Sequence, residues 1–215
     1  MPSAKIEWPS PEEMRIFSDQ ITKIQPAVVN KCLFLDGTPM TVQKFSNSMK
    51  QRHHYSGKSK TTCINNILVF APDGCLVFAR MNCPGSQHDA RAMGELRDML
   101  LNPEELPGPF GLLADSAFPH VGTFEGKIET PLRADELARI PEGIRGTERQ
   151  HGRDVSSVRV AAEWGMAGIK NVWQQLKKNL TYDDMLRKDI LLAIVHLHNF
   201  RVRSTEISQI RTVFL

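Results

Sequence analysis

Two aspartates in this sequence stand where an apolar run stops. Asp36 follows the run KCLFL and precedes Gly-Thr-Pro, and Asp115 follows the apolar residues 110–114. A carboxylate at the end of a buried strand is costly to desolvate unless a cation or hydrogen-bond donors meet it there. Asp36 is therefore either a turn residue or a ligand, and Asp115 is either a cap or a second ligand. Because open α/β sheets build their sites at the ends of adjacent strands, we expect the two carboxylates to converge.

A third acid lies on the longest predicted helix, at residues 156–178. Glu163 shares one narrow sector of this helix with Arg159 and Lys170, because offsets of four and seven residues return nearly to the same angle. The simpler interpretation is a solvated glutamate paired with Arg159, which stabilises a helix by only about 0.2–0.5 kcal/mol. In the alternative, Glu163 reaches over a sheet edge to the aspartates, and Arg159 and Lys170 contact phosphates.

Three converging carboxylates would need cations between them. Without cations they would repel one another and raise each other's pKa values. Mg²⁺ binds carboxylate oxygens, keeps several waters and completes its coordination shell with phosphate oxygens, and Mn²⁺ prefers similar ligands. Two such ions would activate water on one side of a phosphodiester and stabilise the leaving oxygen on the other. The acids therefore predict a magnesium site, with manganese as a substitute, that acts on phosphodiesters.

A basic window of the sequence, residues 37–72, contains no Asp or Glu. Its lysines and arginine are Lys44, Lys50, Arg52, Lys58 and Lys60. The whole chain carries a net charge of only +3, so this excess of positive charge is local. The window is either a solvated loop or a surface that faces the phosphates of a nucleic acid.

The segment Ser86-Gln87-His88-Asp89 also has two interpretations. Ser86 and Asp89 have the spacing of a capping box, and the helix dipole favours an acid in the first turn. Under this interpretation a helix begins here and runs to about residue 101. Alternatively, His88 or Asp89 lies beside the metal site and supports its ligands.

The elements that must position these residues alternate between helix and strand. A helix is predicted from the N-cap Ser10 to near Pro26, with Glu13 closing a capping box. Strands are predicted at residues 28–35, 40–45, 63–70, 75–81 and 110–114, and a turn at residues 71–74 joins the third and fourth. Residues 46–60 are predicted as an exposed loop, and a last helix at about residues 182–202. The pattern predicts an α/β fold with a central mixed sheet flanked by helices.

Composition indicates an ordinary globular domain. The 215 residues are 41% apolar and 24% charged, which fits one sizeable domain. No apolar run approaches the ~20 residues of a membrane span, and the N-terminus lacks a secretory pattern, so we expect a soluble intracellular protein. The four cysteines form no Cys-x-x-Cys pair, which argues against a zinc site.

Four segments, taken in order, resemble the motifs of a known family. They are LDGT at 35–38, PGSQHDAR at 84–91, LADSAFP at 113–119 and SSVRVAAEWGMAGIKNVW at 156–173. Together they resemble the PIF/Harbinger group of DDE-superfamily transposases and their domesticated nuclease relatives. The resemblance covers nearly all of the chain.

The resemblance implies an RNase H-like nuclease fold in which Asp36, Asp115 and Glu163 bind two Mg²⁺ ions and cut DNA. It divides the chain into a helical leader, residues 1–27, and an endonuclease domain, residues 28–215. Members of the group carry a helix-turn-helix region before the nuclease, so we expect a separate DNA-binding protein to supply that part. A nuclear location and a homo-oligomer are also expected. The alternative is a domesticated, inactive copy that serves as a DNA-binding or protein-interaction module.

Overall fold

The computed structural model describes residues 3–87 and 89–215, with the side chains of Asp89 and Ala90 left out. The strands are β1 (Lys31–Thr41), β2 (Tyr55–Ser56), β3 (Thr61–Phe70), β4 (Leu76–Pro84), β5 (Gly111–Leu113) and β6 (Ile128–Glu129). The helices are α1 (Pro11–Ile24), α2 (Ser48–His54), α3 (Asp89–Ala92), α4 (Glu95–Leu101), α5 (Ala134–Arg139), α6 (Glu142–Val172), α7 (Asp184–Thr205) and α8 (Gln209–Phe214). Two short 3-10 turns are η1 (Gly122–Phe124) and η2 (Gln174–Lys177).

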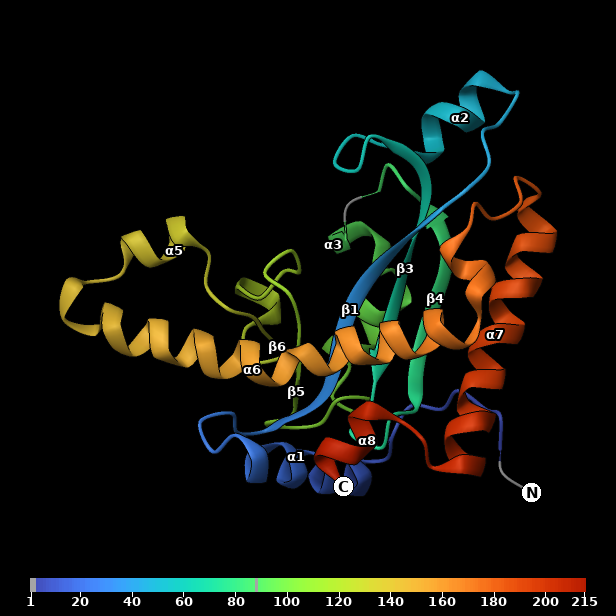
Figure 1. Cartoon of the computed structure of the whole chain (residues 1–215). Helices are drawn as coiled ribbons and strands as arrows, with labels where there is room; N and C mark the ends of the chain where they lie inside the picture. Colours follow the sequence, from blue (N-terminus) through green and yellow to red (C-terminus); the bar gives the residue numbers. More distant parts are fainter. Residues whose placement is uncertain (1–2, 88) are drawn as a thin grey trace.

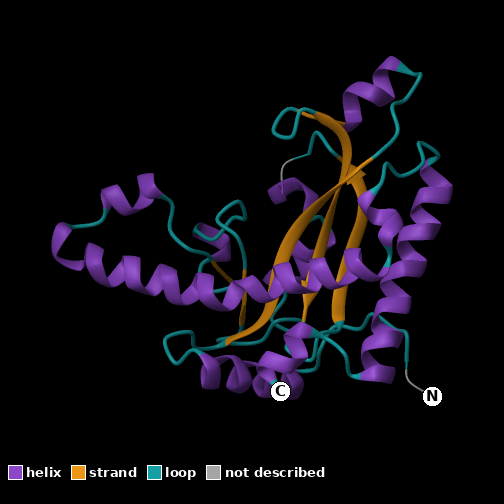
Figure 2. Cartoon of the chain, viewed as in Figure 1, coloured by secondary structure: helices purple, strands orange, loops and turns teal. Residues whose placement is uncertain are grey.

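The strands form a mixed sheet in the order β4-β3-β1-β5-β6, with β2 pairing the first residues of β3. β3 lies antiparallel to both β1 and β4, whereas β5 lies parallel to both β1 and β6. Helices lie on both sides of this sheet (Figure 2). The predicted fold class, an RNase H-like α/β fold with a central mixed sheet flanked by helices, is therefore confirmed.

Alternation along β1 gives the sheet two apolar faces. Phe34 and Met40 belong to the core under α6, α7 and α8, while Leu33 and Leu35 belong to the core under α1 and α4. Successive strand residues point to opposite faces, so a strand buried on both sides must be apolar at nearly every position. α6 crosses the first face (Figure 1). None of the helices in the described part of the chain is long and apolar enough to span a membrane.

Two elements predicted from local motifs, helix α1 and the turn at residues 71–74, are present in the structure. The capping box of α1 is present: the Glu13 N–H donates to the Ser10 hydroxyl, and the Glu13 carboxylate accepts from the Ser10 N–H. The turn at residues 71–74 joins β3 to β4, where the Gly74 N–H donates to the Ala71 carbonyl and Gly74 has a φ of 85°. Glycine is suited to this left-handed conformation because it lacks a Cβ.

The prediction that a strand ends at Asp36 was wrong. β1 is one continuous strand that passes through Asp36, Gly37, Thr38 and Pro39. Its antiparallel partner β3 pairs with this whole stretch, including Asp36 with Leu68. Long-range pairing thus overrides the local turn preference. Pairing of β1 with β5 ends at Phe34, so Pro39 lies where β1 has an open edge and a missing N–H is tolerated.

One loop prediction and two helix predictions also needed correction. The region 46–60 contains α2 in addition to loop, and the single helix expected at residues 86–101 is divided into α3 and α4 at Gly94, whose φ is 50°. α6 begins at Glu142, well before residue 156, and ends at Val172, before residue 178. Its first residues lack an apolar stripe and include three glycines, which lower helix propensity, so sequence pattern could not reveal them.

A close contact under α6 leads to a first prediction, on stability. A Cβ added at Gly165 would lie 2.7 Å from two ring atoms of the fully buried Phe70. We expect Gly165→Ala to lower the free energy of unfolding by about 1–3 kcal/mol, because the packed ring must move. Gly168→Ala is the matched control, since a Cβ there meets nothing within 4 Å, and should raise stability by up to ~1 kcal/mol. Urea unfolding measures both; equal stabilisation by the two changes would contradict the contact.

Candidate active site

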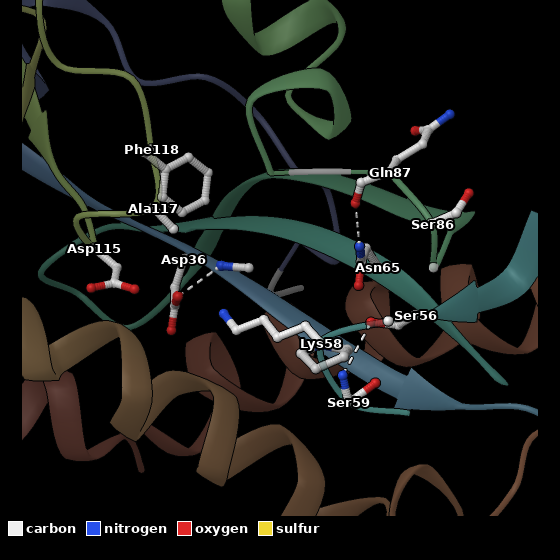
Figure 3. A pocket seen from close by; sticks show the side chains of 14 residues that line it. Asp36, Ser56, Lys58, Ser59, Asn65, Ser86, Gln87, Asp115, Ala117 and Phe118 are labelled. Carbon is white, nitrogen blue, oxygen red and sulfur yellow. Dashed lines mark hydrogen bonds between the residues drawn. The ribbon is translucent and has the colours of Figure 1, made fainter. Parts of the chain in front are cut away.

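Asp36 and Asp115 come from neighbouring parallel strands. Phe34 of β1 pairs with Leu113 of β5, and each aspartate lies two residues beyond its member of this pair. Because side chains alternate with a period of two, both carboxylates leave the sheet on the same face, the one that α6 covers. They line one cavity of about 520 Å³, and Figure 3 shows them pointing to the same side of their strands.

The Asp36 carboxylate is largely buried and forms no direct ion pair with another described residue. Its Oδ1 accepts a hydrogen bond from the Gly37 N–H at 2.8 Å. Burial raises the pKa of Asp36 to about 6; the Gly37 N–H and the nearby Arg159 oppose this shift, while Asp115 and Glu163 add to it. Asp115 likewise accepts from the N–H of the following residue, Ser116, at 2.8 Å. The site therefore holds an anionic cluster that a cation would stabilise.

Glu163 lies near Asp36 and forms an ion pair with Arg159. Its Oε1 accepts from the Arg159 guanidinium at 2.8 Å, and its side chain is 53% exposed while that of Arg159 is 17% exposed. It is close enough to contribute to the raised pKa of Asp36. Among the side chains that the structure describes, those of residues 3–87 and 91–215, no three His, Cys, Asp or Glu are grouped closely enough to hold a metal ion. The fold thus joins two of the predicted acids and leaves the third in an ion pair beside them.

Lys170 of α6 also faces the site. Its Nζ donates to the Thr38 hydroxyl at 2.7 Å, and Thr38 lies two residues beyond Asp36 on the same face of β1. Burial lowers the pKa of Lys170, while Asp36 acts in the opposite direction. A half-buried ammonium group is therefore held next to the carboxylates. Sequence reasoning missed Thr38, although its spacing of two from Asp36 was the signal that could have identified it.

The lysines and arginine of the basic window line three cavities. Lys58 lines the cavity of Asp36 and Asp115, and its side chain extends into that cavity in Figure 3. Lys44 and Lys60 line a second cavity. Lys50 and Arg52 line a third cavity, where the Lys50 ammonium lies 3.3 Å from the Asp184 carboxylate.

The loop after β4 closes the remaining side of the cavity. Asn65 of β3 donates to the Gln87 carbonyl at 2.7 Å, which fixes this loop over the sheet. Gly85 is required there, because a Cβ would lie 2.3 Å from the Cys63 carbonyl oxygen and 2.6 Å from that of His54. His88 and the side chain of Asp89 lie outside the described residues, so their two interpretations both remain predictions.

Comparison with known proteins identifies the family. No curated protein and no solved structure matches the chain. A family model described as DDE superfamily endonuclease matches residues 35–199, which is more than half of the chain. The match begins one residue before Asp36 and also contains Asp115 and Glu163. The chain belongs to the DDE superfamily of endonucleases.

Proposed function

We propose that the chain is a metal-dependent DNA endonuclease of the transposase type, from the PIF/Harbinger group, with Asp36, Asp115 and Glu163 as its metal ligands. The observation that carries the proposal is the pair of aspartates on adjacent parallel strands, facing one cavity with the pKa of Asp36 raised to about 6. Perturbed carboxylates gathered in a cavity are typical of functional sites.

The carboxylates suit a magnesium or manganese site. Asp36 and Asp115 offer oxygen ligands to one cavity. Burial first, and Asp115 and Glu163 to a smaller extent, raise the pKa of Asp36, and a divalent cation would stabilise the ionised carboxylate there. Glu163 would complete the set once its carboxylate leaves Arg159. When bound, the ions would supply an activated water and neutralise charge on the leaving oxygen.

The chain's own cations would position the substrate. Lys58 lines the cavity of the aspartates, and Lys170 lies beside them on α6. Both can hold a DNA phosphate in place as point charges, and Arg159 can bind phosphate in a bidentate manner after it releases Glu163. Their task is to orient the phosphodiester at the carboxylates, since positioning contributes much of the catalysis in phosphoryl transfer.

A nicking assay on supercoiled plasmid tests the proposal. The purified chain should convert the plasmid to open circles with Mg²⁺ or Mn²⁺ and should lose this activity with EDTA. Cleavage that persists in EDTA would contradict a metal-dependent mechanism.

A competing proposal is an inactive, transposase-derived module that binds DNA or another protein. The Arg159–Glu163 pair favours it, because Arg159 already neutralises the charge of the third acid. Metal binding distinguishes the two proposals. A nuclease is stabilised against heat by Mg²⁺ or Mn²⁺, and Asp36→Asn should remove that stabilisation. An inactive module gains no carboxylate-dependent stability from either ion.

A second prediction concerns phosphate contacts of the basic window. Lys58→Ala should reduce the slope of log affinity against log salt for duplex DNA by about one, because one phosphate contact is lost. Lys50→Ala should reduce it less, since Lys50 is paired with Asp184. Fluorescence anisotropy over a salt series measures both slopes. An unchanged slope for Lys58→Ala would make this lysine an ordinary solvated residue.

A further inference from the structure

Part of the molecule projects away from the sheet. This arm consists of α5 and residues 142–154 of α6, and Figure 1 shows it extending to one side. No residue of α5 is buried, and the first buried residue of α6 is Val155. The core therefore does not explain why these residues are helical, because most helical stability comes from packing of an apolar face.

The arm is nevertheless anchored at its base. The Arg133 guanidinium donates to the Ser116 carbonyl, next to Asp115. The His151 ring lies 2.6 Å from the Glu129 carboxylate at the end of β6. Arg145 donates to the Ile140 carbonyl at 2.9 Å, which closes the bend between α5 and α6. These contacts fix the arm relative to the candidate active site.

A cavity of about 240 Å³ lies between α6 and the chain that leads into α5. On the α6 side, Arg149, Gly152, Arg153 and Ser156 line it. Arg149, Arg153 and Ser156 are spaced by four and three positions, and Gly152 is three positions from Arg149 and four from Ser156, so they lie on one face of the helix. A Cβ at Gly152 would meet nothing within 4 Å, so internal packing does not require the glycine, and a ligand can approach the helix closely there.

Two arginines that line this cavity have no ion-pair partner among the described residues. Arg149 and Arg153 form no ion pair within the described part of the chain. Two acids of the arm, in contrast, do have partners: Asp135 lies 3.8 Å from Arg139, and Glu136 lies 3.3 Å from His120. Glu148 is the acid that lines the cavity, which leaves the cavity with one net positive charge.

The cavity and the candidate active site lie on the same side of α6. Arg149 and Glu163 are about four helical turns apart, which is ~21 Å at ~1.5 Å per residue and returns nearly to the same angle. Duplex DNA rises by about 3.4 Å per base pair, so this separation corresponds to about six base pairs. Arg153 is ten residues from Glu163, which is ~15 Å at ~1.5 Å per residue, or about four base pairs. We propose that Arg149 and Arg153 bind the phosphate backbone of a duplex that lies along α6, about four to six base pairs from the bond that is cut. The inference rests on the proposed nuclease function.

The chemistry of the cavity favours DNA over a protein partner. Guanidinium groups bind phosphate with two parallel hydrogen bonds, and such contacts position a protein on a duplex without reading its sequence. A protein interface would need a central apolar patch. The apolar residues that line the cavity, Pro131, Leu132 and Leu137, are only partly exposed, and the one large apolar side chain exposed in the helices of the arm is Ile144.

Binding without cleavage tests the site separately from the nuclease. In EDTA, the double change Arg149→Gln with Arg153→Gln should reduce the salt slope for a duplex by about two. Arg139→Gln is the matched control, because Arg139 lies on the same arm, is paired with Asp135 and does not line the cavity. Circular dichroism melting should show the same fold for all the variants.

Footprinting then tests the distance. On a duplex with a mapped cut, the double variant should lose hydroxyl-radical protection about four to six base pairs to one side of that cut, and Arg139→Gln should keep it. An unchanged slope and footprint, with plasmid nicking intact, would overturn the arm site alone. A reduced slope without nicking by any variant would support the phosphate contact and contradict the nuclease. Altered self-association with unchanged DNA binding would make the arm a protein contact and overturn the proposal.

Discussion

Asp36→Asn and Asp115→Asn are each expected to abolish metal-dependent nicking of supercoiled DNA, with a fall in rate of at least ~10³-fold. Metal ions contribute several kcal/mol to such reactions, and each 1.36 kcal/mol is a factor of about ten in rate. An amide removes the negative charge that binds the ion while it keeps the shape of the side chain. Full cutting by either variant would contradict its assignment as a ligand.

Asp36→Asn should also raise the free energy of unfolding near neutral pH, although it abolishes nicking. The pKa of Asp36 is raised from its usual 3.8 to about 6, so the folded chain holds this proton more tightly than the unfolded chain does. The stability that the protonated Asp36 contributes is therefore greatest below pH ~4, and it is lost as the pH rises towards 6. The loss is at most about 3 kcal/mol, from two pKa units at 1.36 kcal/mol each.

Urea unfolding in EDTA from pH 4 to pH 7 measures this effect. The difference in stability between Asp36→Asn and wild type should grow in favour of the variant between pH 4 and pH 6. Mg²⁺ at pH 7 should stabilise the wild type and have little effect on the variant. The exposed Asp189 of α7 gives the matched control, Asp189→Asn. A stability difference that is constant across this pH range would contradict the raised pKa of Asp36.

Glu163→Gln is expected to lower the nicking rate by ~10²-fold or more without a measurable change in folding. The Glu163 side chain is 53% exposed and pairs with Arg159 one helical turn away, and such pairs contribute at most about 0.5 kcal/mol to stability. A large effect on rate therefore cannot come from loss of the folded state. It would arise because a neutral amide is a weak ligand for a divalent cation.

Glu142→Gln, at the start of α6, controls for removal of a helix carboxylate far from the site. The nicking rate and the urea midpoint of both variants should be measured together. If Glu163→Gln cuts as fast as wild type, the glutamate is a surface residue that pairs with Arg159. In that case the two aspartates must bind metal with another ligand.

Local patterns determined α1, the turn at residues 71–74 and the α/β class. The capping box of Ser10 and Glu13 and the left-handed Gly74 involve only neighbouring residues, so their energetics can be read directly from the sequence. The candidate acids were likewise visible, because charge at the end of an apolar run is unusual and the run itself is local. The family resemblance identified the third acid, which a helical pattern alone could not distinguish from a solvated glutamate.

Tertiary structure decided what these residues contact. Asp36 lies within a strand because β3 pairs with β1 along residues 34–41, a contact between segments that local preference cannot anticipate. The register of β1 with β5 brings Asp36 beside Asp115, and the path of α6 sets Lys170 against Thr38. The lysines and arginine of the basic window line three cavities for the same reason: residues close in sequence need not line the same cavity. Chain pairing and helix packing, which depend on distant residues, therefore fixed the geometry of the site.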